Sequence, residues 1–151
     1  MTDADDLTLS VSTFIAAPPE RVWAVMTQRQ ADWWCPVPWR TEIVAQEWRP
    51  GGRCAMVMHG PDGEAMPNEG VFLEVVPGRR FVTTDAFTAG WAPAGPFMVG
   101  IWEIMPEGAG TRYTGSARHW TREARDQHEA MGFTTGWSAV AEQLRQLCEA
   151  P

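Results

Sequence analysis

The sequence predicts a single α+β domain in which a long C-terminal helix covers a curved antiparallel sheet. Residues 7–15 alternate apolar and polar side chains, which is typical of a half-buried strand. Six further strand-like runs are separated by short turns, and an apolar stripe at helical spacing ends the chain. Because the turns are too short to hold crossover helices, successive strands should pair as hairpins. We expect one domain over residues 1–151.

Two short helices are expected directly after the first strand. Pro18-Pro-Glu20 predicts the start of one, because proline suits the first turn and an acid favours the positive end of the helix dipole. Residues 30–34 predict the second, which the prolines of residues 35–38 end. The strand-like runs follow near residues 40–48, 53–59, 69–76, 80–88, 97–105 and 111–119.

The C-terminal stripe predicts one long helix that begins after the capping residue Thr121. Trp137 and Val140 lie on its apolar side and are expected to be buried against the sheet. Gly132 and Gly136 interrupt the stripe, and each glycine costs a helix about 1 kcal/mol relative to alanine. Two interpretations remain open: the glycines allow close packing against the sheet, or they leave room for a ligand.

Charge and composition exclude several classes of partner. Twelve basic residues, all arginines spread along the chain, face nineteen acids, so the net charge is −7 and no basic stripe exists for nucleic acid or an anionic membrane. The longest uncharged run, residues 86–102, is broken by Gly and Pro and cannot span a membrane. The acidic start, Met1 to Asp6, predicts no signal peptide, and three widely spaced cysteines suit free thiols in the cytoplasm.

Strand alternation places three titratable side chains on the inner face of the sheet: Glu69, Asp85 and His119. His128, early in the last helix, could make a fourth. In an apolar cavity such groups have shifted pKa values and can act as general acids or bases. The alternatives are that they pair with one another or anchor a ligand, and a β-bulge would reverse the alternation. The spacing of His119 and His128 matches no metal motif, so neither metal nor cofactor is expected.

Large apolar side chains are the remaining candidates for a binding site. Nine Trp and six Phe accompany a single Tyr, and rings of this size either dominate a core or line a cavity. Trp91, on a loop bounded by Gly and Pro, is a candidate lid. The side chains expected to line a cavity, each with plain core as its alternative, are Trp34, Met56, Phe87, Trp102, Tyr113, Met131 and Trp137.

Several phrases add a family resemblance to this pattern. They are Ala16-Ala-Pro-Pro-Glu-Arg-Val-Trp23, Asp32-Trp-Trp34, Pro50-Gly-Gly-Arg53, Gly60-Pro-Asp-Gly63, Asn68-Glu-Gly-Val-Phe-Leu-Glu-Val-Val-Pro77, Phe81 to Phe87, and His128-Glu-Ala-Met-Gly-Phe-Thr-Thr-Gly-Trp137. In this order they resemble the SRPBCC (START-like, helix-grip) superfamily, and within it the single-domain bacterial branch of the family named for the activator of the heat-shock-protein-90 ATPase.

The resemblance implies a sheet of six or seven strands that grips the C-terminal helix around a cavity for apolar molecules. Three functions are therefore kept. The first is binding of a small, mostly apolar or aromatic ligand. The second is a cofactor-independent enzyme that uses Glu69, Asp85 and His119. The third is a regulator of a chaperone ATPase, or another protein-interaction module.

Overall fold

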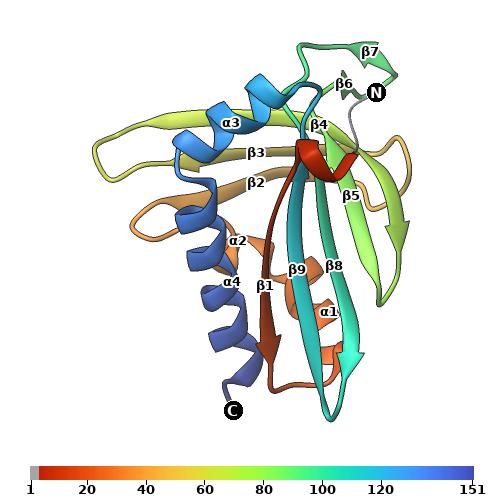
Figure 1. Ribbon diagram of the computed structural model, residues 1–151, viewed down its shortest axis with the longest axis vertical. Coiled ribbons are helices and arrows are strands. Elements are labelled where there is room, and N and C mark those ends of the chain that lie inside the picture. The colour runs from red at the N-terminus through yellow and green to blue at the C-terminus, as the bar shows by residue number, and fades with distance from the viewer. Residues whose placement is uncertain (1–3) are drawn as a thin grey trace.

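Seven strands form one antiparallel sheet in a computed structural model that describes residues 4–151. The first three residues of the acidic start lie outside the described part. Figure 1 shows β2, β3 and β4 running nearly across the direction of β1, β9 and β8, so the sheet is strongly curved, as predicted. In sheet order the strands are β1 (Thr8–Ile15), β9 (Gly110–Arg118), β8 (Val99–Glu107), β5 (Arg80–Thr84), β4 (Ala65–Val76), β3 (Arg53–His59) and β2 (Arg40–Gln46).

The helices occur near the start and at the end of the sequence. A 3-10 turn, η1 (Ala4–Leu7), precedes β1, and the two predicted short helices, α1 (Pro19–Gln28) and α2 (Gln30–Trp33), follow it. The chain ends with α3 (Arg122–Ala130) and α4 (Phe133–Glu149), and Figure 1 shows α4 running beside β1. Within the described residues, every helix is too short or too polar to cross a membrane.

The predicted single C-terminal helix is two helices, which corrects the sequence interpretation. Thr121 is its N-cap as expected, because its Oγ1 accepts a hydrogen bond from the backbone N–H of Ala124 at 3.1 Å. The helix breaks at Gly132, whose φ of +100° lies in a region that side chains with a Cβ rarely adopt. Gly132 is therefore a stop between α3 and α4, whereas Gly136 remains inside α4.

Two irregularities in the sheet also correct the predicted strands. The run expected over residues 80–88 ends as β5 at Thr84, and a small separate hairpin follows, β6 (Phe87–Thr88) with β7 (Ala92–Pro93). In β4, the register to β5 shifts around Leu73, where a β-bulge intervenes. A bulge adds one residue to one strand, so side chains before it face the opposite way from the simple alternation.

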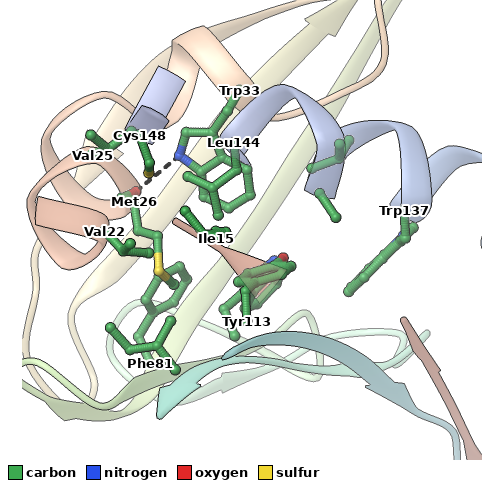
Figure 2. Close-up of a cluster of buried hydrophobic side chains, with 14 of the residues drawn as sticks. Ile15, Val22, Val25, Met26, Trp33, Phe81, Tyr113, Trp137, Leu144 and Cys148 are labelled. Carbon is green, nitrogen blue, oxygen red and sulfur yellow. Dashed lines mark hydrogen bonds between the residues drawn. The ribbon is translucent and has the colours of Figure 1, made fainter. Parts of the chain in front are cut away.

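A packed core fills the space between α1, α2, the C-terminal half of α4 and strands β1 and β9. Figure 2 shows this cluster, in which the indole N–H of Trp33 donates a hydrogen bond to the carbonyl of Met26 at 3.3 Å. Ile15, Val22, Met26, Trp33, Tyr113 and Leu144 are all 0% exposed. Val140 and Trp137 are buried, as predicted. Figure 2 shows Trp137 at the edge of the same cluster, apart from Leu144 and Trp33.

Candidate functional site

A cavity of about 490 Å³ opens between the curved sheet and the C-terminal helices. Its walls come from β3, β4, β5 and β8 on the sheet side, from α3 and α4 on the helix side, and from the segment after α2. This volume lies within the range of sites for small molecules, which are mostly apolar and carry few polar groups. The cavity is therefore the candidate site.

Stacked aromatic rings form one wall of the cavity. Trp102 stacks on Phe81 with ring centroids 5.1 Å apart and on Trp137 at 5.5 Å. Trp34 meets the edges of Trp102 and Trp137 at 5.4 and 5.1 Å. The ring of Trp102 lies over Gly100, where an added Cβ would approach Trp102 Cη2 to 2.4 Å. A glycine at position 100 is thus what lets this wall form.

Methionine side chains make most of the remaining surface. Of the eight methionines in the chain, Met56, Met58, Met66, Met98 and Met131 line the cavity. Unbranched thioether side chains adapt to ligands of different shape and make favourable contacts with aromatic rings. The wall of rings and the flexible methionines together favour an apolar occupant over a polar one.

The predicted polar residues are placed differently from one another. Asp85 lines the cavity, but its Oδ1 accepts hydrogen bonds from the backbone N–H groups of Phe97 at 2.7 Å and Met98 at 3.2 Å. Its carboxylate therefore fixes the start of β8. This engagement leaves Asp85 in a structural role at the edge of the cavity.

The inward position predicted for Glu69 is wrong, because the bulge around Leu73 reverses the alternation that was used to place it. Glu69 pairs with Ala55, whereas Cys54 and Met56 supply the cavity face of β3. The side chain of Glu69 is exposed and forms two hydrogen bonds with the Arg53 guanidinium, both at 2.9 Å. This ion pair lowers the pKa of Glu69. Although Glu69 borders the cavity, its carboxylate is already engaged.

His119 and His128 lie together on the helix side of the cavity. Nε2 of His119 is 2.9 Å from Nδ1 of His128, and Nδ1 of His119 is 2.9 Å from the carbonyl oxygen of Leu7. Both residues are buried, but only His128 lines the cavity. Burial, and secondly the neighbouring His119, lower the pKa of His128 to about 4. His128 is therefore neutral at pH 7, and the predicted set of Glu69, Asp85 and His119 does not meet at one point.

Among the predicted lining residues, Trp34, Met56, Trp102, Met131 and Trp137 do line the cavity. Tyr113 belongs to the packed core, and burial raises its pKa. Phe87 and Trp91 pack against each other in the small hairpin at 5.9 Å, and the Trp91 ring lies over Gly51, where an added Cβ would be 2.9 Å away. Trp91 is 56% exposed, as expected for a loop, but contacts this turn and not the cavity lining.

Sequence reasoning missed several lining residues that a simple signal could have found. Cys54 and Met58 share the alternation of Met56 on β3, and Met98, directly before β8, continues the alternation of Trp102. Met66 and Asn68 could not be predicted, because the bulge in β4 reverses which residues before it face the cavity. Burial raises the pKa of Cys54 to about 11, so its thiol is not poised for nucleophilic attack. Over residues 4–151 no three metal-binding side chains come together.

The lining carries no positive charge in the part of the chain that the structure describes. The chain has no lysine, and each of its twelve arginines lies outside the residues that line the cavity. The indole N–H of Trp102 is buried without a hydrogen bond partner among residues 4–151. At neutral pH, the polar groups that line the cavity are therefore a few neutral groups and two carboxylates, which already accept hydrogen bonds.

Comparison with known proteins agrees with this architecture. Residues 16–149 match the family described as "Activator of Hsp90 ATPase homolog 1-like protein". A crystal structure of a protein from Nitrosomonas europaea is 37% identical, covers 97% of this chain and 96% of its own, and has a TM-score of 0.87. A crystal structure from Mycobacterium smegmatis is 27% identical, covers 100% and 96%, and has a TM-score of 0.80.

A solution structure from Arthrobacter aurescens, 24% identical with a TM-score of 0.83 over 100% of this chain and 91% of that one, shows a like fold. No curated protein matches the chain. The family match spans nearly all of the sequence, and the Nitrosomonas europaea protein aligns over the same length. The expected resemblance is confirmed: the chain belongs to the Activator of Hsp90 ATPase homolog 1-like family, with the START-like, helix-grip fold.

Proposed function

We propose that the protein binds a small, mostly apolar or aromatic molecule in the cavity between the sheet and the C-terminal helices. The observation that carries this proposal is the cavity of about 490 Å³ with its wall of stacked rings and methionines. A dry packed interior of the same composition would leave few voids larger than a water molecule. In the packed core beside the cavity, side chains such as Ile15, Trp33 and Leu144 are 0% exposed, so the hollow is a local feature of this site.

An acid–base enzyme is less well supported by the same geometry. The carboxylates of Asp85 and Glu69 already accept hydrogen bonds from backbone amides and from Arg53. His128 is the best remaining candidate for a general base. A general base works best when its pKa is near the working pH. With a pKa of about 4, the His128 imidazole is a weak base and a good hydrogen bond acceptor. This balance supports binding over acid–base catalysis as the proposed function.

Gly136 offers a direct test of the cavity. It lines the cavity from α4, and an added Cβ would meet only Pro36 Cγ, at 3.8 Å. A leucine side chain at this position would extend into the hollow, and leucine is a better helix former than glycine. Gly136→Leu should therefore fill part of the cavity while the fold is kept. Gly136→Ala is the matched control, since its single methyl group leaves most of the volume free.

Calorimetric titration with naphthalene should give saturable binding to the wild type and to Gly136→Ala. We expect affinity to fall at least about tenfold in Gly136→Leu, because the loss of one filled subsite of this size is worth about 1.4 kcal/mol or more. Equal affinity in all three proteins would place the probe elsewhere and contradict the proposal. A regulator of a chaperone ATPase acting through its surface would be indifferent to Gly136→Leu, so stimulation assays on the same variants separate that alternative.

A further inference from the structure

The hydrogen bonds of the histidine pair determine where its protons lie. The carbonyl oxygen of Leu7 can only accept, so Nδ1 of His119, 2.9 Å away, carries a proton. In a neutral His119 ring, Nε2 then has a lone pair and no proton. The proton shared between the rings must therefore belong to Nδ1 of His128, which lies 2.9 Å from that lone pair. Leu7 thus sets the tautomer of both rings.

This arrangement leaves Nε2 of His128 as an acceptor at the cavity. Nε2 lies on the side of the ring away from His119, and it has no hydrogen bond partner within residues 4–151. Among residues 4–151, the fully buried side-chain polar atoms without a hydrogen bond partner do not include this Nε2. The atom therefore remains accessible. Because burial and the neighbouring ring keep His128 neutral at pH 7, Nε2 carries a lone pair there. A ligand can satisfy this atom only by donating a hydrogen bond to it.

The charges around the cavity further restrict the class of ligand that it can bind. A ligand carboxylate would face the His128 lone pair, and the described lining has no arginine to balance its charge. Burying an unpaired charge is very costly. A ligand ammonium group would have only Asp85 as a counter-charge and would compete there with the backbone amides of Phe97 and Met98, because Glu69 is paired with Arg53. An uncharged ligand avoids both penalties.

We propose that the cavity selects an uncharged molecule with a flat apolar body and one hydroxyl or N–H group, which donates a hydrogen bond to Nε2 of His128. The inference rests on the proposed function and deepens it by naming the ligand class. The flat body fits the ring surfaces of Trp102 and Trp137, and Phe97, 4.6 Å from the His128 ring, flanks the donor position. His119 acts as a positioning residue, because it fixes which nitrogen of His128 is bare.

The test compares probes of one shape that differ in a single group. They are 2-naphthol, a neutral donor; 2-methylnaphthalene, which has no polar group; 2-methoxynaphthalene, which only accepts; 2-naphthoate, an anion; and 2-naphthylmethylammonium, a cation. Calorimetric titration at pH 7 should rank 2-naphthol first. We expect it to bind about tenfold more tightly than 2-methylnaphthalene, as for a hydrogen bond formed inside an apolar site. The anion and the cation should bind more weakly than 2-methylnaphthalene.

Three variants connect that preference to the histidine pair. His128→Phe removes the acceptor and should abolish the preference for 2-naphthol while 2-methylnaphthalene still binds. His119→Phe removes the atom that fixes the tautomer, so His128 can carry its proton on Nε2, and 2-methoxynaphthalene should gain on 2-naphthol. His59→Phe is the control, because His59 lies outside the cavity, with its Nε2 2.8 Å from Oε1 of Glu42. It should leave every ratio unchanged.

A ligand-free measurement covers the case in which a variant fails to fold. Nitrogen-15 NMR of the histidine side chains in the wild type should show His128 protonated at Nδ1 and bare at Nε2. The opposite tautomer overturns the inference. Equal affinity for 2-naphthol and 2-methylnaphthalene, or tighter binding of either ion, overturns the inference and leaves the proposed binding function standing. If none of the five probes binds, the proposed function and the inference fall together.

Discussion

The packed core and the cavity lie side by side along α4, and they bury apolar side chains in different ways. In the packed core, Leu144 of α4 meets residues such as Ile15 and Trp33, and all three are 0% exposed. At the other end of α4, Gly136 and Trp137 border a hollow of about 490 Å³. The C-terminal half of α4 therefore covers the packed core, and its N-terminal half covers the cavity.

The difference lies in the residues that each region uses and in how they are supported. The packed core closes around side chains whose polar atoms find local partners, as the Trp33 indole does at the Met26 carbonyl. The cavity instead has a wall of rings in mutual contact, and the residues on either side of Trp34 are held from α4. The Gln143 side-chain amide donates to the carbonyls of Trp33 at 3.0 Å and Cys35 at 3.1 Å. These hydrogen bonds fix the segment that carries Trp34 and so help to keep this wall of the cavity in place.

The largest expected effect separates the two regions by stability. Trp33→Ala should lower the free energy of unfolding by about 3–5 kcal/mol, because it leaves a hole in a dense region. Met58→Ala should cost about 1 kcal/mol, since Met58 is half-buried and borders space that is already empty. Urea denaturation of both variants measures the contrast. Similar losses would mean that the cavity lining is packed as tightly as the core.

Much of the fold could be predicted because it depends on local signals. Alternation identified β1, the turns between strand-like runs identified β3 and β9, Thr121 identified the start of α3, and the apolar stripe identified the buried side of α4. The break at Gly132 was read as a cost within one helix, because a positive φ depends on the path of the chain and not on the residue type alone.

The candidate site was predictable only where strands stay regular. Trp102 was placed correctly because β8 continues without a bulge up to it, whereas Glu69 was not, because the irregularity in β4 depends on pairing with β5. Phe87 was misplaced for a similar reason, since β5 ends at Thr84. The contact of His119 with His128 joins the end of β9 to α3, and no spacing rule in the sequence gives its geometry.

A smaller effect tests the polar edge of the cavity through pH. Because the pKa of His128 is about 4 in the folded protein and about 6.5 in an unfolded chain, the unfolded state binds this proton more tightly. Stability should therefore fall as the pH drops below about 6.5, by about 2 kcal/mol between pH 7 and pH 5. Urea denaturation at the two pH values measures the loss.

His128→Phe should make that pH dependence shallower, and His59→Phe, which changes a histidine paired with Glu42 outside the cavity, should not. Both variants keep the Arg53–Glu69 ion pair, and the lowered pKa of Glu69 affects stability only nearer pH 4. A wild-type stability that is flat from pH 7 to pH 5 would show that the His128 imidazole is reached by bulk water.

The smallest expected effect is that of Gly136→Ala, which is compared with Gly115→Ala, a second glycine near Trp137. Gly136→Ala should raise the free energy of unfolding by about 0.5–1 kcal/mol, because alanine favours the helix and the new Cβ meets only Pro36 Cγ at 3.8 Å. Gly115→Ala should have the opposite sign, a loss of about 1–3 kcal/mol, since its Cβ would lie 2.8 Å from Tyr113 Oη and 3.2 Å from Trp137 Cε3. Thermal and urea denaturation of the pair give both signs in one experiment. If Gly136→Ala also destabilised the protein, the space beside Gly136 would be filled, and the boundary between packed core and cavity would have to move along α4.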